Sequence, residues 1–266
     1  MHADSEAPRT GRTFTRCADC SRRCGADRTS TESKAACGIG RQARIAAAVE
    51  GQIIFAGCSL ACLYCPTPEA NRHAQGQPVD AATLADLMAA HAQGPERPLR
   101  LVHASHVAAH VAEALDLLGA ARPSLIWMSS GFDGVVSLDR LAGRIDAFQP
   151  EAKFGSDRAA RMLAGVQGYV AANRAAIAEM LRQVGPARSG DAHHGVVVRH
   201  QVLPDGLAET HAALSWLPKG TPVQILEDYD PHHKAGQHPK LRRSVTQAEI
   251  DDARSILDDL GLVPWP

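Results

Sequence analysis

From about residue 52 onwards, short apolar runs alternate with longer segments of mixed apolar and polar residues. Short runs of this kind are typical of buried strands, and the longer segments are typical of helices. The strand candidates are residues 52–56, 99–104, 124–130, 145–154, 195–204 and 223–230. The helix candidates, one after each strand, are residues 80–93, 106–119, 137–143, 156–184, 207–216 and 246–260.

Six strand–helix units in series predict an α/β fold with a parallel sheet, because each helix forms the crossover between two parallel strands. A complete TIM barrel would need about eight such units. We therefore expect one barrel-like domain over residues 46–266. Residues 1–45 carry four of the cysteines and are interpreted as a separate Cys-rich metal-binding segment, called the leader below.

The composition narrows the class of partner. The 266 residues are 45% hydrophobic, enough to bury a substantial core. The formal net charge is -1, so no long-range field would gather nucleic acid or an anionic membrane. No run approaches about eighteen apolar residues, and the first residues lack the basic start and apolar stretch of a secretory signal. We expect a cytoplasmic protein that binds neither nucleic acid nor membrane.

All seven cysteines lie between Cys17 and Cys65. In a reducing cytosol, such clustering favours metal ligation by thiolates over disulfides. The cysteines fall into a group of four and a group of three. The first group is Cys17, Cys20, Cys24 and Cys37, and the second is Cys58, Cys62 and Cys65.

The second group follows the first strand candidate directly, with the spacing Cys58-x3-Cys62-x2-Cys65. A 4Fe-4S cluster takes one thiolate per iron, so three cysteines leave one iron free to bind a ligand that is not protein. A structural zinc would want a fourth ligand. His73 is a candidate, but it is distant from Cys65 and separated from it by a polar stretch.

This CxxxCxxC pattern, with Tyr64 before its last cysteine, resembles the signature of the radical S-adenosylmethionine (SAM) enzymes. The resemblance implies that the open iron chelates the amino and carboxylate groups of SAM. It implies that an electron from the cluster cleaves SAM to methionine and a 5'-deoxyadenosyl radical, which takes hydrogen from a substrate. It also implies the partial (βα)6 TIM-like barrel of the radical SAM type, in which the cysteine loop follows the first strand.

The other strand candidates also end in polar residues. The sites of such folds gather at the carboxyl ends of the strands, and burying an unpaired charge is costly, so we expect these side chains to line a cavity. They are His103, Ser105 and His106, then Ser129, Ser130 and Gly131, then Glu151 and Lys153, then Arg199 and His200, and finally Glu227, Asp228, Tyr229 and Asp230. For any one of them, a surface position or an ion pair at the barrel rim remains the alternative.

A narrower resemblance extends over nearly the whole chain. Residues 155–185, 195–204 and 239–253, together with 17–28 and 37–40 of the leader, resemble the uncharacterised homologues of pyruvate formate-lyase activating enzyme. The fourth strand of those relatives ends in an Asp-x-Lys pattern, and the fifth carries an Arg-His pair. The first is matched here with a glutamate in place of the aspartate, and the second is intact.

The resemblance and the strand-end positions together give the predicted site. The predicted catalytic residues are Glu151, Lys153, Arg199 and His200. The predicted SAM-binding residues are His106, Ser129, Ser130, Lys153 and Arg199. The Gly-Gly-Glu that radical SAM enzymes often place after the second strand is replaced by residues 103–106, of which only His106 matches the pattern of the close relatives.

The four leader cysteines supply the thiolates of either a structural zinc or an auxiliary 4Fe-4S cluster, and the sequence does not separate the two. Arginines are frequent in the same segment and predict a solvated face or a dock for an acidic partner, such as a flavodoxin- or ferredoxin-like electron donor. They are Arg9, Arg12, Arg16, Arg22, Arg23 and Arg28.

Two substrates are compatible with these observations. By its resemblance, the protein would take a hydrogen from a backbone glycine of a glycyl-radical enzyme. Alternatively, it would act alone on a small molecule. A hypothesis from another class is a non-catalytic iron-sulfur or metal-binding electron-transfer protein.

Overall fold

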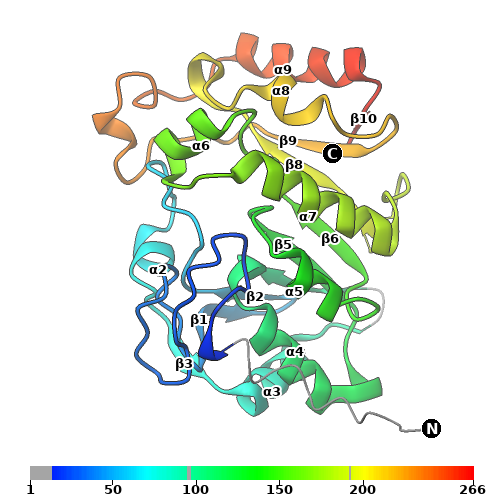
Figure 1. The fold of residues 1–266 in the computed structure, drawn as a ribbon. Coiled ribbons are helices and arrows are strands. Elements are labelled where there is room, and N and C mark those ends of the chain that lie inside the picture. Colours follow the sequence, from blue (N-terminus) through cyan, green and yellow to red (C-terminus); the bar gives the residue numbers. More distant parts are fainter. Residues whose placement is uncertain (1–13, 95–96, 192) are drawn as a thin grey trace, which may run out of the picture.

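The computed structural model describes residues 14–94, 97–191 and 193–266. Its strands form a seven-stranded sheet of order β3-β1-β2-β4-β5-β6-β7 and a three-stranded sheet of order β10-β9-β8 (Figure 1). The strands are β1 (Ala43–Val49), β2 (Gln52–Phe55), β3 (Gln77–Val79), β4 (Leu99–Val102), β5 (Leu125–Ser129), β6 (Ala147–Pro150), β7 (Gly195–Val196), β8 (Val198–Gln201), β9 (Pro222–Leu226) and β10 (Val263–Pro264).

The parallel strands continue from one sheet into the other. β2, β4, β5, β6 and β7 pair in parallel, as do β8 and β9. A parallel bridge between Glu151 and Arg199 joins the end of β6 to β8. β7 and β8 together correspond to the single strand predicted over residues 195–204. At Val197 this strand leaves the seven-stranded sheet and continues in the three-stranded sheet. The predicted partial (βα)6 barrel is confirmed.

The helices lie outside the strands (Figure 1). They are α2 (Pro68–Arg72), α3 (Ala81–His91), α4 (Ala108–Leu118), α5 (Val135–Arg140), α6 (Asp157–Ala164), α7 (Tyr169–Val184), α8 (Thr210–Leu214) and α9 (Gln247–Leu260). In three of them, the side chain of the N-cap residue accepts a hydrogen bond from the backbone N–H of the residue three positions further on. This bond satisfies one of the N–H groups that have no partner within the first turn. These side chains are Asp80, Ser156 and Thr246.

Several details differ from the sequence predictions. The single helix predicted over 156–184 is two helices, because Gly165 and Gly168 adopt φ values of 62° and 65° and end one helix before the next begins. Three strands were not predicted: β1, which pairs antiparallel with β2, β3, which pairs antiparallel with β1, and β10, which pairs parallel with β9. The boundary expected between residues 45 and 46 falls inside β1, so the division into leader and barrel stays a proposal.

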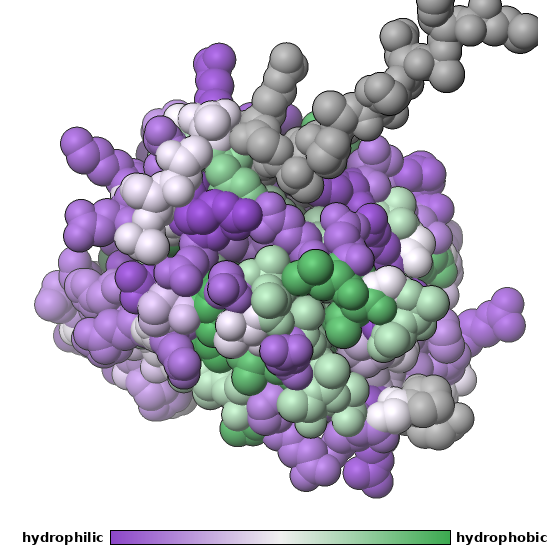
Figure 2. Space-filling view, turned by 90° about the horizontal axis from the view of Figure 1, so that it is seen from below, coloured by the Kyte–Doolittle hydropathy of each residue, from purple (hydrophilic) through white to green (hydrophobic). Residues whose placement is uncertain are grey.

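The core has two main clusters of apolar side chains. One lies between the sheet and its helices and includes Leu101, Trp127 and Phe148, each 0% exposed. The other surrounds the cysteine loop and includes Leu60 and Tyr169. Seen from below, the surface is mostly hydrophilic with a smaller apolar area (Figure 2). Among the described helices, none has the length and apolar character that a membrane span requires.

Candidate functional site

A cavity of about 410 Å³ opens at the carboxyl ends of the parallel strands. The cysteine loop after β2 forms one wall, and residues at the ends of β4, β5, β6, β8 and β9 form the others. The structure thus brings most of the predicted site residues together. The residues at this cavity include Cys58, Cys62, Cys65, His106, Ser129, Ser130, Glu151, Lys153 and Arg199.

Backbone hydrogen bonds fix the cysteine loop. Leu63 donates to Leu163 of α6 at 2.8 Å, and Leu63 accepts at its carbonyl from Lys234 at 2.8 Å. Two of the sulfurs accept hydrogen bonds, Cys58 from the Leu60 N–H at 3.4 Å and Cys65 from the Asn71 amide at 3.5 Å. The loop therefore holds its sulfurs at the cavity wall.

Burial raises the pKa of the Cys58 thiol to about 11 and that of the Cys62 thiol to about 12. Both are therefore protonated at neutral pH unless a metal takes the place of the proton. Three thiols leave a tetrahedral structural zinc one ligand short. A 4Fe-4S cluster takes one thiolate per iron, so three thiols hold it and leave one iron open. Three thiols on one cavity wall therefore fit a cluster better than zinc.

An ion-pair cluster faces the cysteines across the cavity. Lys153 pairs with one carboxylate oxygen of Glu151, and Arg199 lies 3.9 Å from the other. The three side chains are 13%, 18% and 20% exposed for Lys153, Glu151 and Arg199 respectively. Burial alone would raise the pKa of Glu151, but the two cations outweigh it and lower that pKa. Two cations and one carboxylate leave this wall with one excess positive charge.

Helix α7 positions this wall. The Tyr169 hydroxyl accepts from the Lys153 N–H at 3.0 Å, and it lies 3.0 Å from the Ser130 carbonyl and 3.1 Å from that of Glu151. The Asn173 amide donates to the carbonyls of Gly131 and Glu151 at 3.0 and 2.9 Å. The ends of β5 and β6 are thereby tied to one helix. Neither residue was predicted from the sequence, where the only signal is their place in the first turns of a helix after Gly168.

A buried carboxylate, Asp133, organises the turn after β5. It accepts from Trp127 at 2.9 Å, from Ser129 at 2.7 Å and from Ser105 at 3.4 Å. Ser105 also lies 3.1 Å from the Ser130 hydroxyl, so the two predicted serines are held by this network. Burial raises the pKa of Asp133, although these hydrogen bonds act in the opposite direction. Asp133 could not be predicted from the sequence, because the geometry of the turn determines its hydrogen-bond partners.

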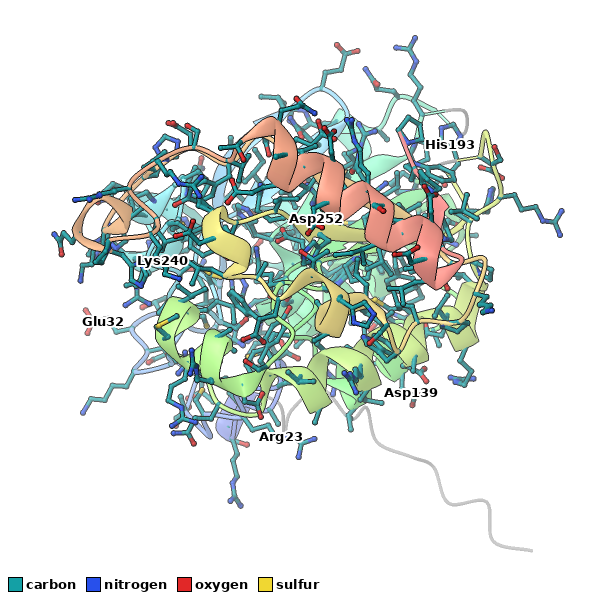
Figure 3. All side chains as sticks on the ribbon, turned by 90° about the horizontal axis from the view of Figure 1, so that it is seen from above. Arg23, Glu32, Asp139, His193, Lys240 and Asp252 are labelled. Atoms are coloured by element: carbon teal, nitrogen blue, oxygen red, sulfur yellow. The ribbon has the colours of Figure 1, made fainter. Side chains whose placement is uncertain are left out.

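Replacing Asp133 by Ala is expected to lower the free energy of unfolding by about 3 kcal/mol, because three buried donors lose their acceptor. Chemical denaturation monitored by circular dichroism measures the change. Asp139→Ala is the matched control, since Asp139 is an exposed residue of α5 and lies at the periphery (Figure 3). Equal denaturation midpoints for Asp133→Ala and the control would contradict this role.

The predicted histidines differ in their placement. His106 is 1% exposed, and its Nε2 lies 2.9 Å from the Ala56 carbonyl, beside the cysteine loop. His200 does not line the cavity, contrary to the prediction. Its ring contacts the Ala152 carbonyl at 2.6 Å and the Thr210 hydroxyl at 3.0 Å. The reason is strand alternation, which turns His200 to the face opposite Arg199.

His103 was predicted to line the cavity, without a catalytic or SAM-binding role, and it does line it. It has a left-handed backbone conformation, with φ 62° and ψ 35°, which is unusual for a residue other than glycine. Its ring lines the cavity, and its Nδ1 is buried without a hydrogen-bond partner among the described residues. Burial lowers the pKa of His103, so the ring is neutral and keeps an acceptor for a ligand.

The leader packs against the barrel beside this site. Cys20 forms an antiparallel bridge with Asp133, and Cys17, Cys20 and Cys37 are buried while Cys24 is exposed. The predicted solvated face of arginines is wrong for Arg28, which is 0% exposed. Arg9 and Arg12 of that set lie outside the described residues.

The α/β architecture, with this cavity at its strand ends, is similar to that of a solved structure. A radical SAM methyltransferase from Sphaerobacter thermophilus has a similar structure, with a TM-score of 0.51 and 18% identity over 80% of this chain and 65% of that one. An uncharacterised protein of Methanocaldococcus jannaschii is 23% identical over 145 residues, 52% of this chain and 39% of that protein. The chain thus spans less than two thirds of either relative. No family model matches it.

Proposed function

We propose that the protein is a radical SAM enzyme. The observation that carries this proposal is the meeting of three cysteine thiols and the Glu151–Lys153–Arg199 cluster on one cavity in a radical SAM fold. A 4Fe-4S cluster bound by the thiols would supply the electron that cleaves SAM to methionine and a 5'-deoxyadenosyl radical. Cys58, Cys62 and Cys65 would hold that cluster.

The remaining residues would bind and orient SAM. The excess positive charge of Lys153 and Arg199 attracts the carboxylate of its methionine part. His103 Nδ1 can accept a hydrogen bond from a donor group of the ligand. A cavity of about 410 Å³ lies within the usual size range of small-molecule sites. Tyr64 and Leu60 line the same cavity and help exclude water.

The substrate is a hydrogen donor, either a glycine of a glycyl-radical enzyme or a small molecule. The first alternative is supported by the resemblance to homologues of pyruvate formate-lyase activating enzyme. A flavodoxin- or ferredoxin-like protein would deliver the electron. In this proposal the enzyme is an oxidoreductase of the activating-enzyme type.

The proposal is tested by reductive cleavage of SAM. Anaerobically reconstituted protein, reduced with dithionite and given SAM, is expected to release 5'-deoxyadenosine slowly even without its substrate. Liquid chromatography with mass detection measures the product. Absence of deoxyadenosine from protein that contains iron and sulfide would reject the enzyme and leave the electron-transfer hypothesis.

A further inference from the structure

Arg28 is a fully buried cation at the contact of the leader with the barrel. Its Nη1 donates to the Cys17 sulfur at 3.3 Å and to the His106 carbonyl at 3.2 Å. Its Nη2 lies 3.4 Å from His110 Nδ1, while its Nε has no hydrogen-bond partner among the described residues. A guanidinium does not lose its proton in a protein, so this charge needs compensation inside the fold.

The carboxylate nearest to Arg28 compensates it only in part. Asp19 lies 3.6 Å from Arg28, but it lies equally far from Arg140. It also accepts from the Ala109 N–H at 3.1 Å and the Ser137 hydroxyl at 3.0 Å. The histidines offer no charge, because burial lowers the pKa of both His106 and His110. The other groups near Arg28 that can carry negative charge are the sulfurs of Cys17 and Cys37.

Burial raises the pKa of the Cys20 and Cys37 thiols, and backbone N–H groups act in the opposite direction, from Arg22 at Cys20 and from Ile39 at Cys37. Backbone N–H groups of Ala26 and Ala36 help to lower the pKa of Cys24. Each of these cysteines thus has a backbone donor two residues further on, as Cys58 has in Leu60. Arg28 interacts electrostatically with the sulfurs of Cys17 and Cys37. Hydrogen bonds from backbone N–H groups stabilise the charged form of sulfur.

We propose that Arg28 is the buried counter-charge of an anionic four-thiolate metal centre formed by Cys17, Cys20, Cys24 and Cys37. Zinc with four thiolates and an oxidised 4Fe-4S cluster with four thiolates are both doubly negative, so the inference holds for either metal. It does not depend on SAM cleavage.

This arrangement also connects the leader to the cysteine loop. The His106 carbonyl accepts from Arg28, and the His106 ring contacts the Ala56 carbonyl, two residues before Cys58. Gly57 has φ +84°, and a Cβ there would lie 2.6 Å from the Cys37 carbonyl oxygen, so the two segments touch at this point. A second tether runs from Arg22 to the Ser59 carbonyl at 2.8 Å. Arg28 is thus a positioning residue between two metal sites.

The first test measures metal retention. In full-length protein with Cys58, Cys62 and Cys65 changed to Ala, only the leader centre remains to be counted, as zinc or as iron and sulfide. After a chelator challenge, Arg28→Met is expected to retain metal about tenfold less well than its parent, because a charge-assisted hydrogen bond is lost. Arg28→Lys, which keeps the charge, should retain an intermediate amount.

Arg23→Met is the matched control, because Arg23 is exposed and lies at the periphery (Figure 3). It should retain metal like the parent. A parent that binds neither zinc nor iron and sulfide in the leader would overturn the proposal, as would equal retention by Arg28→Met and Arg23→Met.

A second test separates charge balance from ordinary packing. In protein with all its cysteines, Arg28→Met should lower the melting temperature. With Cys17 and Cys37 changed to Ala, Arg28 is left without the thiolates, and Arg28→Met should then leave the melting temperature unchanged or raise it. The same decrease in both backgrounds would mean that Arg28 acts only through Asp19 and His106, against the proposal.

Discussion

Changing Cys58, Cys62 and Cys65 together to Ala is expected to remove one 4Fe-4S cluster and to abolish release of 5'-deoxyadenosine. The three thiols line the same cavity, and removing them leaves no thiol among the residues that line it. Iron and sulfide analysis of anaerobically reconstituted protein should show a loss equal to one cluster. Iron bound at the leader, if that centre is a cluster, should remain.

Ser59→Ala is the matched control for this variant. Ser59 lies in the same loop, and its hydroxyl is buried without a hydrogen-bond partner among the described residues, so its removal takes away no bond. This control should keep the cluster. Unchanged iron and sulfide in the triple cysteine variant would show that the cluster ligands have been assigned wrongly.

The parallel strands could be predicted because each is a short apolar run bounded by polar residues. β5 is an example, since four of its five residues are buried. β1 was missed because Ala43–Val49 contains three consecutive alanines and few large apolar side chains. The break between α6 and α7 was missed because two glycines in an alanine-rich segment do not exclude a helix. The left-handed conformation of Gly165 and Gly168, which separates the two helices, is visible only in the structure.

The site was predictable as far as it depends on position in the strands. Glu151 and Lys153 are two residues apart and both line the cavity. Arg199 and His200 are adjacent, so alternation alone could have shown that they do not both face it. The roles of Asp133 and Arg28 could not be predicted, because they depend on contacts between segments far apart in the sequence. Arg28 reaches His106, 78 residues away.

Replacing Lys153 by Met is expected to weaken SAM binding by about ten- to a hundredfold while leaving the absorption spectrum of the cluster unchanged. The substitution removes the excess positive charge of the wall, because Arg199 is left to balance Glu151 alone. A charge-assisted hydrogen bond to a carboxylate contributes about 1.5–3 kcal/mol, which corresponds to this range. Equilibrium binding of SAM to cluster-loaded protein under anaerobic conditions measures the effect.

The control for this last prediction is Lys219→Met, which changes an exposed lysine that does not line the cavity. It should bind SAM like the parent protein, because an exposed charge is screened by solvent. Glu151→Gln gives the opposite charge change, since it leaves both cations unbalanced and should not weaken the attraction for a carboxylate. If Lys153→Met bound SAM as tightly as Lys219→Met, the Glu151–Lys153–Arg199 cluster would not be the carboxylate-binding wall of the cavity. The excess charge would then serve the substrate or the stability of the strand ends instead.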